Sequence, residues 1–141
     1  MLLADMGAEL LRIAPPTARE AAMPIPDHQD PIWRGRSRLT LDLKDPEGVR
    51  KTLSILGHAD ILIEGYRPGA MERLGLSPEV CFQSNPSLVI GRVTGWGQVG
   101  TWAQMAGHDP NFLGMTGALY SIGPADRPPP LPLNLLGDFS G

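Results

Sequence analysis

Residues 38–49 read RLTLDLKDPEGV and contain the transition that decides the fold. Leu39, Leu41 and Leu43 alternate with polar residues, which is the period of a β-strand with one buried face. Asp45-Pro46-Glu47 then indicates a helix start, because it supplies a side-chain cap, a proline at the first helical position and an acid in the first turn. We therefore predict a strand that passes directly into a helix.

The segments that follow repeat this alternation. Residues 49–56 carry one apolar helical face, and Gly57 is expected to end that helix. The short apolar runs 61–63 and 88–90 predict strands that are buried on both faces of a parallel sheet, with a helix at about Pro78–Gln83 between them. Alternating strands and helices predict an α/β fold with a parallel sheet and right-handed crossovers.

The flanking regions have less regular patterns. Residues 1–14 indicate the end of a helix, a glycine stop and a short strand, and residues 15–37 indicate a loop rich in Pro, Asp and Arg. The glycine-bracketed loop 94–98 follows the last predicted strand, where open α/β sheets usually bind ligands. A helix from about His108 to Leu119 and a proline-rich loop are expected after it.

The composition excludes several classes of function. A chain with 42% hydrophobic and 19% charged residues should fold as a globular protein. Its net charge of −3, without a dense Lys/Arg cluster, argues against a nucleic-acid partner. No apolar run approaches the roughly 18 residues of a membrane span, and the first residues do not resemble a signal peptide. The single cysteine, Cys81, is predicted to be a small core residue on a helix, and we expect a cytoplasmic protein.

A few polar residues are candidates for chemistry. His108 lies between a glycine and a helix start, so its imidazole should project from a loop edge; a structural and a catalytic role both fit. Asp138 follows Gly137 and fits a helix cap, a catalytic carboxylate or both. Asp42 and Lys44 fit either a pair that faces a ligand or an exposed ion pair of little energetic value.

Other residues give weaker signals. Arg67 follows an apolar strand, where an arginine is suited to contact a phosphate. His28 and His58 are expected at solvated surfaces. Because the sequence has no GxGxxG, GxxxxGK[ST], HExxH or paired CxxC motif, nothing supports dinucleotide redox, P-loop or zinc chemistry, and no metal site is expected.

Six stretches in a fixed order carry a family resemblance. They are LLADMGAELLRI (2–13), RLTLDLKDPEGV (38–49), ADILIEGYRPGAMERLGL (59–76), NPSLVIGRVTGWGQVG (85–100), AGHDPNF (106–112) and PLNLLGDFSG (132–141). Together they resemble the class III CoA-transferase (CaiB/BaiF) family, and within it the α-methylacyl-CoA racemases. The AGHDPNF stretch favours the racemases, because the transferases generally lack its histidine.

The resemblance implies a racemase that inverts the α-carbon of 2-methylacyl-CoA thioesters in lipid metabolism, with His108 and Asp138 as the acid–base pair. It implies the substrate acyl-CoA and no cofactor. The fold it implies is part of a doubly wound, Rossmann-like large domain, accompanied by a small domain in an interlocked homodimer. Two stretches match family segments that contact CoA. The first is Leu41, Asp42, Leu43 and Lys44, and the second is Gly107, His108, Asp109, Pro110, Asn111 and Phe112. Arg67 is expected to contact CoA as well.

The implied chemistry fits these residue types. Inverting a carbon next to a thioester requires a base on one face and an acid on the other, and a histidine with a carboxylic acid supplies both. Backbone N–H groups near the helix start at His108 are expected to stabilise the enolate oxygen. Two alternatives remain open: CoA transfer with Asp138 as the nucleophile, and a truncated, non-catalytic remnant that binds CoA.

Three departures from the family pattern bear on activity. The family's opening strand does not precede Met1, Pro15 stands where racemases place an arginine, and the chain ends three residues after Asp138. The small domain and a further active-site glutamate of the family would lie beyond that end. Both ends look cut, so we expect these 141 residues alone to be poorly active, since a sheet that lacks a strand exposes an edge.

Overall fold

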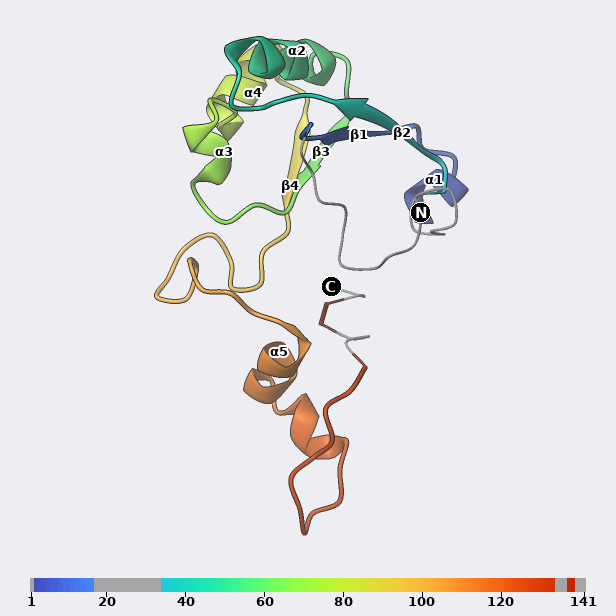
Figure 1. The fold of residues 1–141 in the computed structure, drawn as a ribbon, viewed down its shortest axis with the longest axis vertical. Helices are drawn as coiled ribbons and strands as arrows, with labels where there is room; N and C mark the ends of the chain where they lie inside the picture. The colour runs from blue at the N-terminus through green and yellow to red at the C-terminus, as the bar shows by residue number, and fades with distance from the viewer. Residues whose placement is uncertain (1, 17–33, 134–136, 139–141) are drawn as a thin grey trace. The chain divides into compact units, whose positions relative to one another are not determined.

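The computed structural model describes residues 2–16, 34–133 and 137–138. His28, most of the predicted loop 15–37 and the apolar stretch before Gly137 lie outside these ranges. The chain divides into two compact units, Met1–Ala59 with Leu74–Pro86, and Asp60–Arg73 with Ser87–Gly141. Each unit contains one two-stranded parallel sheet (Figure 1). The α/β fold class and the parallel pairing of strands are thus confirmed, although the described strands form two pairs instead of one continuous sheet.

In the first unit, β1 (Leu10–Ala14) pairs in parallel with β2 (Arg36–Thr40). The short helix α1 (Leu2–Asp5) precedes β1, and the chain reverses at Gly7, whose φ of 96° lies in the left-handed region. Ala14 at the end of β1 is buried, with 1% exposure. The predicted order of helix, glycine stop and strand is confirmed.

Helix α2 (Pro46–Leu56) begins as the sequence predicts. The Asp45 side chain accepts a hydrogen bond from the backbone N–H of Glu47 at 3.0 Å, and Pro46 occupies the first turn. Gly57 ends the helix, but with a right-handed φ of −58° instead of the left-handed conformation of a typical glycine stop.

Asn85 satisfies the carbonyl groups at the end of α2. It follows α4 (Pro78–Ser84), and its Nδ2 donates to the carbonyls of Leu56 at 3.1 Å and Ala59 at 2.8 Å. One side chain therefore ties the ends of two helices together. On α4, Cys81 is fully buried, as predicted for a small core residue.

The predicted strand over residues 38–43 is wrong at its end, because β2 stops at Thr40. Asp42 starts a turn instead: its Oδ1 accepts the N–H of Lys44 at 2.9 Å, and its carbonyl accepts the N–H of Asp45 at 3.2 Å. The alternating leucines concealed this turn, since Leu41 and Leu43 are both half-buried and the N–H of Leu41 still donates to the carbonyl of Ala14 in β1 at 2.9 Å.

The turn packs directly on α2 at Gly48. A Cβ atom at Gly48 would overlap the carbonyl oxygen of Asp42 and lie 2.8 Å from its carbonyl carbon. The buried Gly48 thus lets the segment that carries the predicted CoA-contacting residues approach the helix closely.

The second unit pairs β3 (Ile61–Glu64) with β4 (Val89–Arg92) in parallel, and α3 (Ala70–Arg73) follows β3 (Figure 1). Both strands were predicted, but burial on both faces was wrong. Ile61, Ile63 and Val89 are 56–60% exposed. They share one face of the pair because Ile61 lies opposite Val89 and side chains alternate along a strand, and no described segment of the second unit covers that face.

The predicted helix over 108–119 is two elements. Helix α5 (Asp109–Met115) ends where the Thr116 hydroxyl donates to the Phe112 carbonyl at 3.0 Å. Gly117 then takes a left-handed φ of 77°, and the 3₁₀ helix η3 (Ala118–Ser121) follows. In the described ranges no helix has the length and apolarity needed to cross a membrane.

Replacing Gly48 with Ala tests the packing of the 41–45 turn. Alanine favours a helix over glycine by about 1 kcal/mol, but the clash with a backbone carbonyl should outweigh this gain and lower the free energy of unfolding by about 2 kcal/mol. Denaturant titration measures the change. The control is Ser54→Ala on the exposed face of α2, which should change stability by less than about 0.5 kcal/mol. Equal stability of the two variants would contradict the packing described above.

Candidate active site

The second unit contains Arg67, residues 107–112 and Asp138, whereas residues 41–44 belong to the first unit. The residues of the predicted acid–base pair therefore lie in one compact unit. The geometry of the site is accordingly built from α5, the loop before it and the turn at residues 137–138.

His108 is the residue before α5 and has an extended backbone, with φ −135° and ψ 169°. Its N–H donates to Oδ1 of Asn111 at 3.0 Å, and its carbonyl accepts the N–H groups of Asn111 and Phe112 at 2.8 and 3.3 Å. The backbone of His108 is thus held on both sides. Its imidazole is 77% exposed, as expected for a side chain that projects from a loop edge.

The structure brings His108 and Asp138 together. Nδ1 of His108 lies 3.8 Å from Oδ2 of Asp138, whose side chain is 29% exposed. Two groups that can each carry or release a proton therefore face one another, and they form an ion pair when the imidazole is protonated. Asp138 lies in a turn, and the residues that follow it are outside the described ranges, so its interpretation as a helix cap is not tested.

Asp109, which directly follows His108, connects the His108 segment to the Asp138 segment with its side chain. Its side chain is fully buried, and its Oδ1 accepts a hydrogen bond from the N–H of Gly137, 28 residues along the chain. A contact between CoA and this carboxylate, as the family resemblance implies, would require Asp109 to leave its buried position.

The ring of Phe112 packs against three glycines that come from separate segments. A Cβ atom at Gly95, Gly107 or Gly137 would lie 2.7–2.9 Å from carbons of this ring. The ring also contacts Trp96, with centroids 5.0 Å apart and planes inclined by 58°. Phe112 therefore holds together the loop after β4, the residue before His108 and the residue before Asp138.

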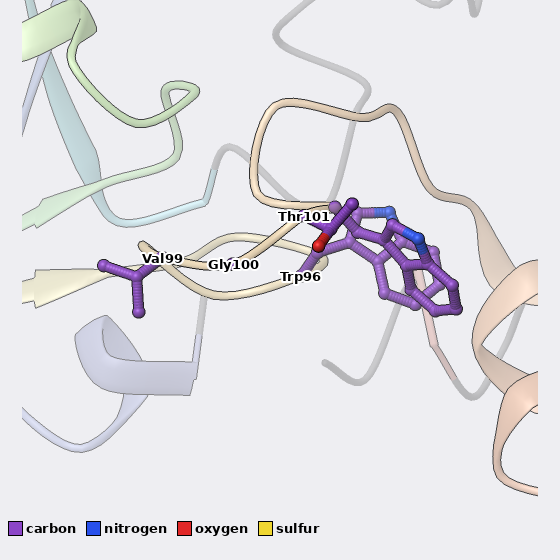
Figure 2. A pocket seen from close by; sticks show the side chains of 5 residues that line it. Trp96, Val99, Gly100 and Thr101 are labelled. Carbon is purple, nitrogen blue, oxygen red and sulfur yellow. The ribbon is translucent and has the colours of Figure 1, made fainter.

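Two tryptophans line an open pocket beside this packing. Trp96 and Trp102 make an edge-to-face contact at 5.2 Å, and Nε1 of Trp96 donates to the Ala106 carbonyl at 3.3 Å. The pocket has a volume of about 420 Å³ and is lined by Trp96, Val99, Gly100, Thr101 and Trp102. In Figure 2, Trp96 and Thr101 lie at one end of the loop and Val99 at the other. The sequence interpretation identified the glycine-bracketed loop 94–98, which contains Trp96, but gave no role to Trp96 or Trp102, whose spacing around Gly97 and Gly100 was the available signal.

Arg92, at the end of β4, links helix α3, which follows β3, to the loop that follows β4. Its guanidinium donates to Glu72 at 2.6 Å and to Gln98 at 3.1 Å, and its Nε lies 3.4 Å from the buried Glu64. The hydrogen bond from Arg92 also lowers the pKa of Glu72, which favours the charged pair at neutral pH. These contacts hold the start of the loop that follows β4 and contains Trp96. They were not predicted from the sequence.

The predicted CoA contacts differ in their accessibility. Arg67, Asp42, Lys44 and Asn111 are exposed. Asp42 uses its carboxylate to accept the backbone N–H of Lys44, so its role in the turn is structural. Leu41, Leu43, Gly107, Pro110 and Phe112 are half-buried.

Comparison with known proteins identifies the family. The family model of CoA-transferase family III matches residues 1–141. The chain belongs to CoA-transferase family III. It is 40% identical over 141 residues to human α-methylacyl-CoA racemase, covering all of this chain and 35% of the relative. It is 34% identical over 136 residues to the succinyl-CoA–D-citramalate CoA-transferase of Chloroflexus aurantiacus, covering 91% of this chain and 34% of the relative.

A solved structure shares the fold. The crystal structure of Rv3272 from Mycobacterium tuberculosis superposes with a TM-score of 0.81 at 27% identity, covering 99% of this chain and 42% of the other. The chain thus spans roughly a third to two fifths of the length of these family III relatives. Because the relatives include a racemase and a transferase, membership in family III establishes an enzyme family but leaves the reaction open.

Replacing Gly107 with Ala tests the packing around Phe112 in this family III chain. The new methyl group would lie 2.7 Å from Cε1 of Phe112 and from Nε1 of Trp96, so stability should fall by about 1–3 kcal/mol and the near-ultraviolet dichroism of the tryptophans should change. Gly114→Ala is the matched control on α5, where no atom lies within 4 Å of the added group. That variant should be as stable as the original protein or more stable by up to about 1 kcal/mol. An unchanged aromatic signal in Gly107→Ala would contradict the arrangement.

Proposed function

We propose that the protein inverts the α-carbon of 2-methylacyl-CoA thioesters by 1,1-proton transfer, with His108 and Asp138 as the acid–base pair. The observation that carries this proposal is the 3.8 Å distance between Nδ1 of His108 and Oδ2 of Asp138. The chain is also 40% identical to human α-methylacyl-CoA racemase, which is named for this reaction, and this similarity supports the proposal.

The proposed reaction needs no other proton carrier. One group of the pair removes the α-proton, the electron pair of the broken C–H bond spreads onto the thioester oxygen, and the other group delivers a proton to the opposite face. The base ends protonated and the acid ends deprotonated, so exchange of protons with solvent restores the pair. The two groups exchange roles when the reaction runs in the other direction.

In the observed structure the side chains of His108 and Asp138 are too close together for a substrate carbon to lie between them. An α-carbon that reacts with both groups needs each of them at about 3–3.5 Å, and a carbon does not fit between atoms 3.8 Å apart. Substrate binding must therefore separate the two side chains. The 77% exposed imidazole of His108 has room to rotate, whereas its backbone is held by Asn111.

The enolate oxygen has one candidate donor in the first turn of α5. Pro110 has no N–H, and the N–H groups of Asn111 and Phe112 donate to the carbonyl of His108. This leaves the N–H of Asp109 as the proposed donor to the developing negative charge, and because Asp109 has 0% exposure, substrate binding must uncover it. One such donor contributes about 3 kcal/mol in comparable sites.

The substrate proposal extends to both parts of the thioester. CoA contacts are proposed from residues 41–44, residues 107–112 and Arg67, with the exception of the Asp109 carboxylate, which is buried. The rings of Trp96 and Trp102 support an apolar part of the acyl group near His108, because Trp96 donates to the carbonyl of Ala106, two residues before His108. Residues 1–141 are proposed to form part of the family's large domain. A homodimer, a cytoplasmic location and a role in fatty-acid metabolism stay predictions.

The second candidate is CoA transfer, which the similarity to a Chloroflexus transferase favours. Asp138 would then attack the thioester carbonyl and release CoA as a thiolate, which attacks the Asp138 carbonyl of the resulting anhydride, breaks its C–O bond and releases the donor acid as a carboxylate. CoA is then held on Asp138 as a thioester, and an acceptor carboxylate reverses these steps, which gives the new acyl-CoA and restores the Asp138 carboxylate. The third alternative, a remnant that only binds CoA, predicts neither reaction.

Hydrogen exchange at the α-carbon distinguishes these candidates. The protein, in the full length in which it occurs, is incubated in D₂O with 2-methylacyl-CoA of a single configuration and no acceptor acid. We expect deuterium at the α-carbon and loss of optical purity. His108→Gln should lower the rate of inversion, measured as loss of optical purity, at least about 100-fold, the usual contribution of a positioned acid or base.

His58→Gln is the matched control, because His58 is an exposed histidine in the turn after α2. Its activity should stay within about twofold of the original protein, as for a surface substitution. Exchange of CoA between two acids without α-deuteration would favour the transferase and contradict the racemase proposal. Absence of both reactions would favour the remnant.

A further inference from the structure

Asp109 is a buried carboxylate that the proposed reaction does not use as an acid or base. It has 0% exposure, and among the described residues its Oδ2 has no hydrogen-bond partner. Burying a carboxylate costs several kcal/mol unless strong contacts compensate for it. Within the described part of the chain, its other oxygen accepts one hydrogen bond, from the N–H of Gly137. Such a costly group calls for a specific role.

The simplest structural role, capping of α5, does not account for it. An acid in a first turn stabilises a helix from an exposed position, where it is worth about 0.3–1 kcal/mol without the cost of burial. At the start of α5 the capping contact is made by other groups, since the N–H of His108 donates to Asn111. The Asp109 carboxylate instead reaches a residue 28 positions away.

The two ends of this hydrogen bond are the chain neighbours of the proposed acid–base pair. Asp109 directly follows His108, and Gly137 directly precedes Asp138. A bond between the neighbours limits how far the backbones of the pair can separate. The surroundings admit no side chain at residue 137, because a Cβ atom there would lie 2.9 Å from the Phe112 ring and 3.1 Å from Oδ1 of Asp109.

We propose that Asp109 is a positioning residue, whose buried carboxylate holds the N–H of Gly137 and thereby keeps Asp138 opposite His108. This inference rests on the proposed function for its effect on rate, but the hydrogen bond itself is independent of it. The tether leaves the side chains of His108 and Asp138 free to separate around a substrate while their backbones stay in register.

Three variants of Asp109 separate positioning from other roles. Asp109→Asn keeps an oxygen that accepts the N–H of Gly137. Asp109→Leu has a similar shape and no acceptor, and it also removes a buried charge, so it should remain folded. Asp109→Ala removes the acceptor and leaves a cavity. The exposed Asp126→Ala is the control for loss of an aspartate elsewhere in the same unit.

In the α-deuteration assay, kcat should fall about 100-fold in Asp109→Leu and Asp109→Ala, the scale expected when a reacting group moves by about 1 Å. The KM should stay within about threefold, because the tether acts on the reacting groups and not on CoA. Asp109→Asn should keep kcat within about fivefold and retain the pH profile of the original protein. Asp126→Ala should leave kcat unchanged.

Protection of the Gly137 amide from hydrogen exchange provides a readout that does not depend on activity. It should be high in the original protein and in Asp109→Asn, and lost in Asp109→Leu. Normal kcat in a folded Asp109→Leu variant, or an Asn variant as slow as the Leu variant, would overturn the positioning role. If the original protein shows no α-deuteration, the proposed function fails, while unprotected Gly137 in the original protein would refute the tether itself.

Discussion

The hydrogen bond between the buried Asp109 carboxylate and the N–H of Gly137 determines the arrangement of the candidate active site. It joins the segment that carries His108 to the segment that carries Asp138, and the Phe112 ring fills the space between them. Glycine is needed at 95, 107 and 137 because each of these backbones touches that ring. Several residues of the AGHDPNF stretch thus have structural tasks: Asp109 and Phe112 hold the site together, and Asn111 fixes the backbone of His108, whose side chain projects outward.

Local sequence patterns predicted most elements, and their failures have local causes. The start of α2 was predictable because its capping aspartate and proline act within four residues. The strand over 38–43 was predicted too long because an aspartate turn at Asp42 carries leucines at strand spacing. The helix after His108 was predicted too long although Gly117 marked its end. Burial of β3 and β4 was overestimated because apolar content shows that a strand can be covered, but does not show which segment covers it.

The candidate site was predictable only through the family resemblance. Taken singly, His108 and Asp138 each fitted an ordinary structural role, and no periodicity links residues that lie in separate loops. The structure supplies what the pattern lacked, a 3.8 Å contact within one compact unit. The roles of Trp96, Trp102 and Arg92 could not be predicted in the same way, because their contacts depend on how the loops after β3 and β4 fold.

The central claim is that His108 and Asp138 serve opposite faces of one carbon, and α-proton exchange from each enantiomer separately tests it most directly. Asp138→Asn and His108→Gln are each incubated in D₂O with pure (2R)- and pure (2S)-2-methylacyl-CoA. If the two groups serve opposite faces, each variant exchanges the α-proton of only one enantiomer, the two variants prefer opposite enantiomers, and neither inverts the carbon. If both variants keep or lose exchange with the same enantiomer, the two groups do not act on opposite faces and the account is wrong.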